Sequence, residues 1–358
     1  MFSGASLGPK NGEYMGKTVK GRLLTATESS KNSSSSSNIH QKEARLTEIV
    51  TRDYICSVAF LVDGKHVVGG SKEGKIRPWR VEDGKEVGTP MDAESAVCSV
   101  AVSRDGKWVV GGTSGGLVTV WNAESHLKVT GFKAHKKQLC TVDISPDGTK
   151  IATGSEDKTF CVWSLWTGKR LLDFGKHNDW VVTVKFSPDG QLIAIATRVT
   201  SVRIYDSQNG RLLVVFPIKV SSASNHSLAW TSDNKQLFVL SRDGNIHCLD
   251  SDVFTAGIST HSQWPTNNSK DAQCIALERN GTFVAASTLS SVSFWDTTTH
   301  KKCGRVVHHP GSISSIAISS NYDLVTAGGN LITVRDLRDV LPPPYCDDVS
   351  AFASNVSA

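Results

Sequence analysis

The stretch that decides the fold is residues 139–164, which read LCTVDISPDGTKIATGSEDKTFCVWS. An alternating apolar run leads into the turn Ser145–Gly148, a second run, Lys150–Ser155, ends in small residues, and a third ends in the large ring of Trp163. Alternation with a period of two, β-branched residues and Gly/Asp punctuation are typical of strands joined by tight turns. The stretch therefore predicts three consecutive strands.

The same turn recurs along the chain at a nearly constant spacing. Its Asp or Asn positions are Asp63, Asp105, Asp147, Asp189, Asp233, Asn280 and Asn321. Successive positions differ by 42, 42, 42, 44, 47 and 41 residues, so seven units follow one another. A sustained period of this size indicates a repeat architecture.

Each unit reads as a small sheet. A fourth, more polar run follows a Gly turn, as in Lys169–Phe174. The third runs of five units end in a large ring: Trp79, Trp121, Trp163, Tyr205 and Trp295. One four-stranded sheet cannot bury both faces alone, but seven sheets arranged radially pack on one another. We predict an all-β fold, a seven-bladed β-propeller of four-stranded antiparallel blades.

These residues resemble WD repeats, the blades of a known family of β-propellers. The resemblance rests on the repeat length, the Ser-Pro-Asp-Gly turn and the Trp-Asp ending of the third strand, which is literal only in Trp295-Asp296. Elsewhere the pair drifts to Trp79-Arg80, Trp121-Asn122, Trp163-Ser164, Tyr205-Asp206, Leu249-Asp250 and Arg335-Asp336. The resemblance covers about residues 44–341, and it implies that partner proteins bind the loops of the ring.

The two ends of the repeat region complement each other. The seventh unit has a third run at Leu331–Arg335 and then meets Pro342–Pro344, and proline lacks the N–H that a central strand needs. Arg45–Val50 lies upstream of the first unit, where the other units carry their fourth run. WD-repeat propellers commonly close in this way, so we expect the N-terminal strand to complete the last blade.

The predicted organisation is a disordered, Ser-rich basic arm at 1–43, the propeller at 44–341 and a flexible C-terminal tail at 342–358. Residues 1–45 carry seven Lys/Arg and three Glu, and the tail carries two Asp, so only +3 of the net +5 falls on the ring. A nucleic-acid binder concentrates positive charge on a folded face. Direct nucleic-acid binding is therefore not expected.

Composition also bears on membrane association, on the state of the cysteines and on the cellular compartment. No run approaches the ~18 apolar residues of a spanning helix, so no membrane partner is expected. The eight cysteines include no C-x-x-C pair, and Cys56, Cys98 and Cys140 repeat every 42 residues, which favours buried structural thiols over disulfides or metal ligands. Free thiols and the lack of a secretory signal predict an intracellular protein, cytoplasmic and/or nuclear.

The resemblance also implies a structural hydrogen-bond network in well-preserved units. Only the third unit supplies every member, as His135, Thr153 (or Ser155), Asp157 and Trp163. The alternative is that His135 and Asp157 belong to a catalytic triad, but the repeat already explains their spacing and no nucleophile is specified. We expect no catalytic residues, no cofactor and no metal, and thus no enzyme.

Candidate partner-binding residues follow from projecting the repeat onto the loops before each first strand and between the second and third strands. They are Arg52, Tyr54, Lys72, Lys136, Trp180, Arg198 and Arg242. Aromatic and arginine side chains around a concave centre are typical of binding hot spots. The alternative is that a neighbouring loop covers Trp180 and that the basic residues are a solvated rim.

Together these patterns predict a non-catalytic protein–protein interaction scaffold or adaptor, monomeric or part of a hetero-complex. The projected charges favour an acidic or phosphorylated protein segment as the partner. The alternative is a scaffold subunit of an RNA- or DNA-associated complex, and a remote alternative is a propeller enzyme.

Overall fold

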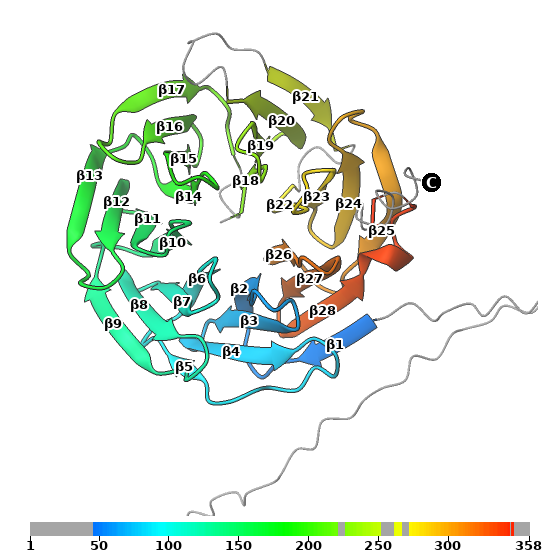
Figure 1. Cartoon of the computed structure of the whole chain (residues 1–358), viewed down its shortest axis with the longest axis horizontal. Coiled ribbons are helices and arrows are strands. Elements are labelled where there is room, and N and C mark those ends of the chain that lie inside the picture. The colour runs from blue at the N-terminus through cyan, green and yellow to red at the C-terminus, as the bar shows by residue number, and fades with distance from the viewer. Residues whose placement is uncertain (1–45, 221–225, 252–260, 267–271, 344, 347–358) are drawn as a thin grey trace, which may run out of the picture. The chain divides into compact units, whose positions relative to one another are not determined.

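The computed structural model describes residues 46–220, 226–251, 261–266, 272–343 and 345–346. In this part of the chain the strands form seven sheets of four antiparallel strands, arranged as a ring around a central opening (Figure 1). The seven-bladed, all-β propeller is thereby confirmed. The arm predicted at 1–43 and residues 347–358 of the predicted tail lie outside the described residues.

The blades are numbered one to seven in the order of their innermost strands. These are β2 (Ile55–Phe60), β6 (Val97–Val102), β10 (Leu139–Ile144), β14 (Val181–Phe186), β18 (Leu228–Trp230), β22 (Ile275–Leu277) and β26 (Ser315–Ile318). The second strands are β3 (His66–Ser71), β7 (Trp108–Thr113), β11 (Lys150–Ser155), β15 (Leu192–Thr197), β19 (Gln236–Leu240), β23 (Phe283–Ser287) and β27 (Asp323–Gly328).

The outer half of each blade follows the same order. The third strands are β4 (Lys75–Arg80), β8 (Leu117–Asn122), β12 (Thr159–Ser164), β16 (Val202–Asp206), β20 (Asn245–Asp250), β24 (Ser291–Asp296) and β28 (Leu331–Asp336). The outermost strands are β5 (Met91–Asp92), β9 (Lys128–Lys133), β13 (Arg170–Lys176), β17 (Leu212–Phe216), β21 (His261–Pro265), β25 (Lys302–His308) and, in blade seven, β1 (Leu46–Val50). One short 3-10 helix, η1 (Leu337–Asp339), follows β28.

The recurring turn is built by local hydrogen bonds. In blade three, Asp147 Oδ1 accepts a bond from the N–H of Thr149 at 3.0 Å, and Ser145 Oγ accepts one from the N–H of Lys150 at 2.9 Å. Gly148 follows with a φ of +68°, which a residue without a Cβ adopts at little cost. The same bonds recur in blade four around Ser187 and Asp189. The turn therefore joins the first two strands of a blade through bonds among neighbouring residues, so its sequence is enough to predict where these strands end and begin.

The core lies between neighbouring blades. Val68 and Ile76 of blade one, for example, pack in one buried cluster with Val97 and Trp121 of blade two. The five predicted ring residues all stand on third strands and are buried, between 1% and 7% exposed. Each blade thus buries its faces against two neighbours, which explains why the units need a closed ring.

Hydroxyl groups join the innermost strands around the axis. Ser57 Oγ accepts the N–H of Val100 in the next blade at 3.1 Å, and Ser99 Oγ accepts the N–H of Val142 at 3.2 Å. The hydroxyl groups of Thr141, Thr183 and Ser315 likewise each accept a backbone N–H of the next blade. These residues recur at the repeat spacing, so the sequence itself carries a signal for this ring of bonds.

The predicted closure is confirmed. Every residue of β1 pairs with β28, from Leu46 opposite Arg335 to Val50 opposite Leu331. Ile49 of β1 is 3% exposed and packs among buried residues of blades one and seven. The first and last parts of the repeat region therefore share one sheet.

Two segments depart from the regular pattern. The outermost strand of blade one, β5, has only two residues, because Gly88 with a φ of +72° and Pro90 interrupt the run that leads to it. Within the predicted tail, Tyr345 packs against Phe283 and donates a 2.8 Å hydrogen bond from its hydroxyl to Asp296 Oδ2.

Candidate protein-binding face

One face of the ring carries the loops that enter the first strands and those that join second to third strands. In blades one to five, a backbone N–H of the second loop donates to a carbonyl of the first. The pairs, donor first, are Lys72–Tyr54, Ser114–Ala96, Glu156–Gln138, Arg198–Trp180 and Arg242–Lys219, at 2.8 to 3.1 Å. This recurring bond brings two side chains per blade to the same face, which we call the loop face.

In two blades the paired residues are an aromatic ring and a cation. Lys72 Nζ lies 4.0 Å from the centre of the Tyr54 ring, and the guanidinium carbon of Arg198 lies 4.6 Å from the centre of the Trp180 indole. Tyr54 is 40% exposed, whereas Trp180 is half-buried and packs on the core of blades four and five. Each cation is held at its ring by a cation–π attraction, which is worth about 0.5–1 kcal/mol at an exposed site.

Blade five pairs two basic residues, Lys219 and Arg242, and both are exposed. Because blades four and five are neighbours, the face there carries a group that we call the blade 4–5 cluster. Its members are Trp180, Arg198, Lys219 and Arg242. Lys219 was missed by the sequence projection, since the segment before β18 is longer than in other units and shifts the paired position.

The other predicted residues are spread over the loop face. Arg52 and Lys72 are exposed on blade one beside Tyr54, and Lys136 is exposed on blade three. Lys136 is positioned by its backbone N–H, which donates to Asp157 Oδ2 at 2.9 Å. The structure thus brings Tyr54 together with Lys72, and Trp180 with Arg198, but leaves the blade-one and blade-three residues on separate blades from the blade 4–5 cluster.

The four residues of the predicted structural network form a hydrogen-bonded chain in blade three. Thr153 Oγ1 lies 2.7 Å from His135 Nε2 and accepts the Trp163 indole N–H at 2.8 Å. On its other side, His135 Nδ1 lies 3.2 Å from Asp157 Oδ2. The arrangement assigns the imidazole proton to Nδ1, so that Nε2 accepts the Thr153 O–H. Ser155, the alternative to Thr153, instead donates to the carbonyl of Gln138 at 2.8 Å.

The ordering of Asp157, His135 and Thr153 has the connectivity of a triad. Thr153 is fully buried, however, and its hydroxyl oxygen already accepts the indole N–H. A nucleophile must reach a substrate, and this hydroxyl cannot. The chain therefore satisfies buried polar groups. Within the described ranges, no three His, Cys, Asp or Glu side chains are placed to hold a metal ion.

Burial lowers the pKa of four histidines in the ring, His135, His177, His226 and His309. Desolvation lowers the pKa of His135 even though Asp157 opposes the shift. Desolvation with a nearby arginine lowers the pKa of His177 to about 4, and desolvation with Lys185 lowers that of His226 to about 3. His177 and His226 are therefore neutral in the folded protein at pH 6, while an unfolded histidine with a pKa of about 6.5 is mostly protonated there.

Stability is therefore expected to fall as the pH drops from about 6.5 towards 4, because the unfolded chain binds more protons than the folded one in that window. Carboxylates whose pKa is lowered, such as Asp105, lose their contribution only below about 3.8. Urea unfolding at a series of pH values measures the slope. His177→Gln should make the dependence of stability on pH less steep in this window, by the slope that corresponds to about one bound proton. Equal slopes for the wild type and the variant would contradict this account.

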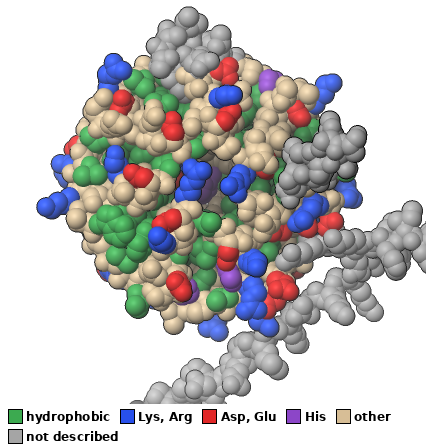
Figure 2. Space-filling view, in the orientation of Figure 1, with side chains coloured by type: hydrophobic (Ala, Val, Ile, Leu, Met, Phe, Trp, Pro, Cys, Tyr) green, Lys and Arg blue, Asp and Glu red, His purple; other side chains and the backbone are tan. Residues whose placement is uncertain are grey.

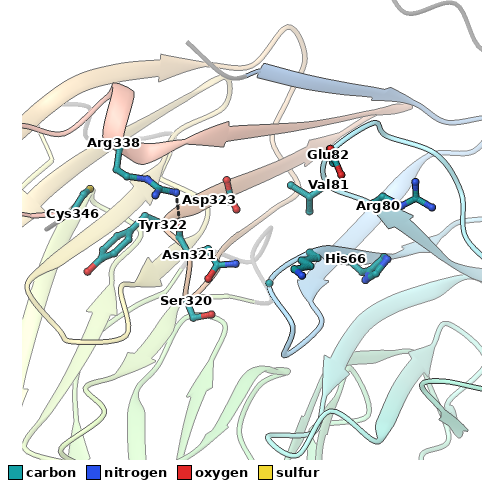
Figure 3. A pocket seen from close by; sticks show the side chains of 12 residues that line it. His66, Arg80, Val81, Glu82, Ser320, Asn321, Tyr322, Asp323, Arg338 and Cys346 are labelled. Atoms are coloured by element: carbon teal, nitrogen blue, oxygen red, sulfur yellow. Dashed lines mark hydrogen bonds between the residues drawn. The ribbon is translucent and has the colours of Figure 1, made fainter. Parts of the chain in front are cut away.

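The opposite face carries a separate cleft between blades one and seven, with a volume of about 740 Å³. Figure 3 shows Arg338 and Arg80 on its two sides, with Asn321 between them. Arg338 is fixed by Asp336 Oδ1 at 2.9 Å and by the carbonyl of Asn321 at 2.9 Å. Some Lys or Arg side chains also lie beside the central opening in Figure 2. Acidic residues such as Glu82 and Asp323 line the same cleft, so its charge favours no single class of ligand.

Two comparisons with known proteins found similarities. The family model of the WD40 repeat (WD domain, G-beta repeat) matches residues 84–122, 126–164 and 168–206. The chain therefore contains three matched WD40 repeats within a seven-bladed β-propeller. It is also similar to eukaryotic translation initiation factor 3 subunit I of Candida glabrata, at 29% identity over 140 residues. That alignment covers 37% of this chain and 40% of the relative, so the chain spans less than half of the relative's length.

A search of the described residues for a helix both long and apolar enough to cross a membrane found no candidate.

Proposed function

We propose that this protein is a non-catalytic interaction scaffold that binds partner proteins on its loop face, chiefly through the blade 4–5 cluster. The observation that carries the proposal is the stacking of Arg198 on Trp180 in blade four, together with the exposed pair Lys219 and Arg242 in neighbouring blade five. An indole held in place by the core can act as an anchor, since aromatic and arginine side chains dominate binding energy at protein interfaces. The WD40 repeats and the initiation-factor relative, itself a subunit, support a role within a multiprotein complex.

The charge of the cluster favours an acidic or phosphorylated segment as the partner. Arg198, Lys219 and Arg242 present three cations on neighbouring blades. Asp179 lies beside Trp180, but its carboxylate accepts the backbone N–H of Trp180 at 2.8 Å. Asp243, next to Arg242, accepts the Ser241 hydroxyl. Both carboxylates serve local structure, and a phosphate or carboxylate of a partner would find guanidinium groups suited to bidentate bonds.

The triple variant Trp180→Ala, Arg198→Glu, Arg242→Glu should lose the partners that co-purify with the wild-type protein from its native cell. We expect their recovery to fall at least about tenfold, because the anchor is removed and the charge reversed. The melting temperature should fall, because Trp180 packs on the buried cluster of blades four and five, but unfolding should remain a single sharp transition above the temperature of the purification. Quantitative mass spectrometry of the purified complexes and thermal unfolding provide the two readouts.

A matched control reverses charge away from the cluster. Lys65→Glu with Lys235→Glu changes two exposed residues of the first turns, on the opposite face, and should leave the partners bound. An unchanged set of partners in the triple variant would refute the proposed site. Equal losses in both variants would show that binding depends on net charge rather than on the loop face.

A second candidate function is a scaffold subunit of an RNA- or DNA-associated complex. The similarity to a subunit of a translation initiation factor favours it. A salt-dependent shift of the protein with mixed oligonucleotides would favour this candidate, because binding to the nucleic-acid backbone weakens as salt rises. The absence of such a shift would favour the interaction scaffold. We place the protein inside the cell, in the cytoplasm and/or nucleus, where such partners occur.

A further inference from the structure

Blade four keeps one part of the blade-three network and lacks another. By the repeat spacing of 42 residues, His177 corresponds to His135, and Val199 corresponds to Asp157. His177 is buried like its counterpart, at 5% exposed, whereas Val199 is 38% exposed on the loop face. Blade four therefore has the histidine of the network without its carboxylate.

Blade three shows how a blade holds an anionic group at this position. The carboxylate oxygen Oδ2 of Asp157 accepts the backbone N–H of Lys136 at 2.9 Å and lies 3.2 Å from His135 Nδ1. In blade four the residue that corresponds to Lys136 is Asn178. Val199 has no oxygen that could accept the Asn178 N–H, so the groups that surround an anion in blade three surround none of this chain in blade four.

The histidine of blade four bonds to a guanidinium instead. Arg203, on β16, donates from Nη1 to His177 Nδ1 at 3.1 Å and from Nε to Ser201 Oγ at 3.2 Å. Burial raises the pKa of Tyr205 and Arg203 opposes the rise, so the phenol also lies near the guanidinium. A guanidinium has five N–H donors, so at least two of those of Arg203 remain for another acceptor.

No carboxylate neutralises this guanidinium. Among the residues that the structure describes, no Asp or Glu forms an ion pair with Arg203. The acidic residues of the adjoining segment serve other groups, since Asp173 pairs with Arg170 at 2.7 Å and Asp179 accepts the N–H of Trp180. The half-buried Arg203 therefore carries an uncompensated positive charge beside the loop face.

A second cation reaches the same place from blade three. The carbonyl of Lys158 accepts the His177 N–H at 2.8 Å, and its Nζ donates to the Asn178 carbonyl at 2.9 Å. Asp157, the neighbour of Lys158 in the sequence, already serves the blade-three network. Lys158 and Arg203 thus both contact the His177–Asn178 pair, and within the described ranges neither has an acidic partner.

We propose that Lys158, the backbone N–H of Asn178 and Arg203 bind a phosphorylated side chain of a partner, which supplies from outside the anion that Asp157 supplies within blade three. We call these three groups the blade four anion site. A phosphate has three acceptor oxygens and up to two negative charges, which match one guanidinium, one ammonium and one N–H better than a carboxylate does. The inference rests on the proposed function, since Asn178 lies in the same loop as the indole of the blade 4–5 cluster.

Three pools of synthetic peptides test the site on the full-length protein. Each peptide has random residues on both sides of a central phosphoserine, glutamate or serine. In fluorescence polarisation the phosphoserine pool should bind at least about tenfold more tightly than the serine pool, because the charge-assisted bonds need the anion. Arg203→Gln should weaken binding of the phosphoserine pool at least about tenfold. Arg211→Gln, at an exposed position on the opposite face of the same blade, is the matched control and should change it less than about twofold.

Val199→Asp restores the carboxylate that the repeat places in blade three. Its side chain should take the Asn178 N–H and face Arg203, so binding of the phosphoserine pool should be abolished. Val199→Asn has the same shape without the charge and should weaken binding less than about threefold. Because position 199 lies at the surface, neither variant should lower the melting temperature by more than a few degrees, which thermal unfolding checks.

Equal binding of the phosphoserine and serine pools, or undiminished binding by Val199→Asp, would overturn the proposal. Equal binding of the glutamate and phosphoserine pools would overturn the assignment to phosphate. Co-purification from the native cell keeps the result separate from the proposed function. If the loop-face triple variant loses its partners and Arg203→Gln keeps them, the anion site is wrong and the loop face stands; if the triple variant keeps its partners, the proposed function is wrong.

Discussion

A chain that begins at Thr51 is expected to aggregate or to lose its single cooperative unfolding transition. Removing β1 exposes the full length of β28, whose residues pair with it from Leu331 to Arg335. It also removes Ile49, which is 3% exposed, and burial of one such side chain is worth about 1.5–3 kcal/mol. The exposed edge is apolar and long enough to pair with other chains.

The measurement compares two truncated chains by calorimetry and size-exclusion chromatography. A chain that begins at Ala44 keeps β1 and should remain monodisperse and melt sharply. A soluble, sharply melting Thr51–Ala358 chain would show that β1 does not close the ring. The expected loss is large because a domain of this kind has a net stability of only about 5–15 kcal/mol.

The second large effect is expected from Thr153→Val in blade three. The substitution keeps the shape of the side chain but removes the hydroxyl that bonds both His135 and Trp163. Two buried polar groups then lack their partner, and each costs about 1–3 kcal/mol. The free energy of unfolding in urea should therefore fall by roughly 2–5 kcal/mol.

Two control variants distinguish the effect of losing the Thr153 hydroxyl from the effect of losing side-chain packing. Thr153→Ser keeps the hydroxyl and removes one methyl group, so it should cost only about 1 kcal/mol. Thr167→Val makes the same chemical change at an exposed position and should lie within about 0.5 kcal/mol of the wild type. If Thr153→Val were as stable as Thr153→Ser, the network would contribute little to the blade.

The strands could be predicted from the sequence wherever the same local turn is repeated. The turn around Asp147 is closed by hydrogen bonds within six residues. Each copy of this turn therefore predicts the two strands that it joins. The pairing of β1 with β28 was also predictable, because one end of the repeat region lacked a strand and the other had one to spare. Register and blade number follow from these two facts.

Features that depend on contacts between blades were not predictable in this way. His226 lies 3.4 Å from Ser57 Oγ and 3.2 Å from Ser315 Oγ, across the axis from blade five to blades one and seven. No spacing in the sequence marks such a contact. The shift of the paired position to Lys219 was also missed, because the step of 44 residues from Asp189 to Asp233 shows that this unit is longer but not which residue pairs with Arg242.

The candidate site was predicted as a set of positions but not as an arrangement. Projection placed Trp180 and Arg198 on one face, whereas the stacking between them depends on the bond that joins their loops. The alternative in which Trp180 is covered is partly realised, because the ring is half-buried and lies under Arg198. A partner would therefore meet the guanidinium first and the indole beside it.

Site-specific photo-crosslinking tests the central claim most directly. A photoreactive amino acid replaces Arg242 on the loop face in one variant and Lys235, in the first turn of the same blade on the opposite face, in another. After irradiation in the native cell, discrete covalent adducts with partner proteins are expected from position 242 and not from position 235. Adducts from position 235 alone, or equally from both positions, would contradict binding at the loop face.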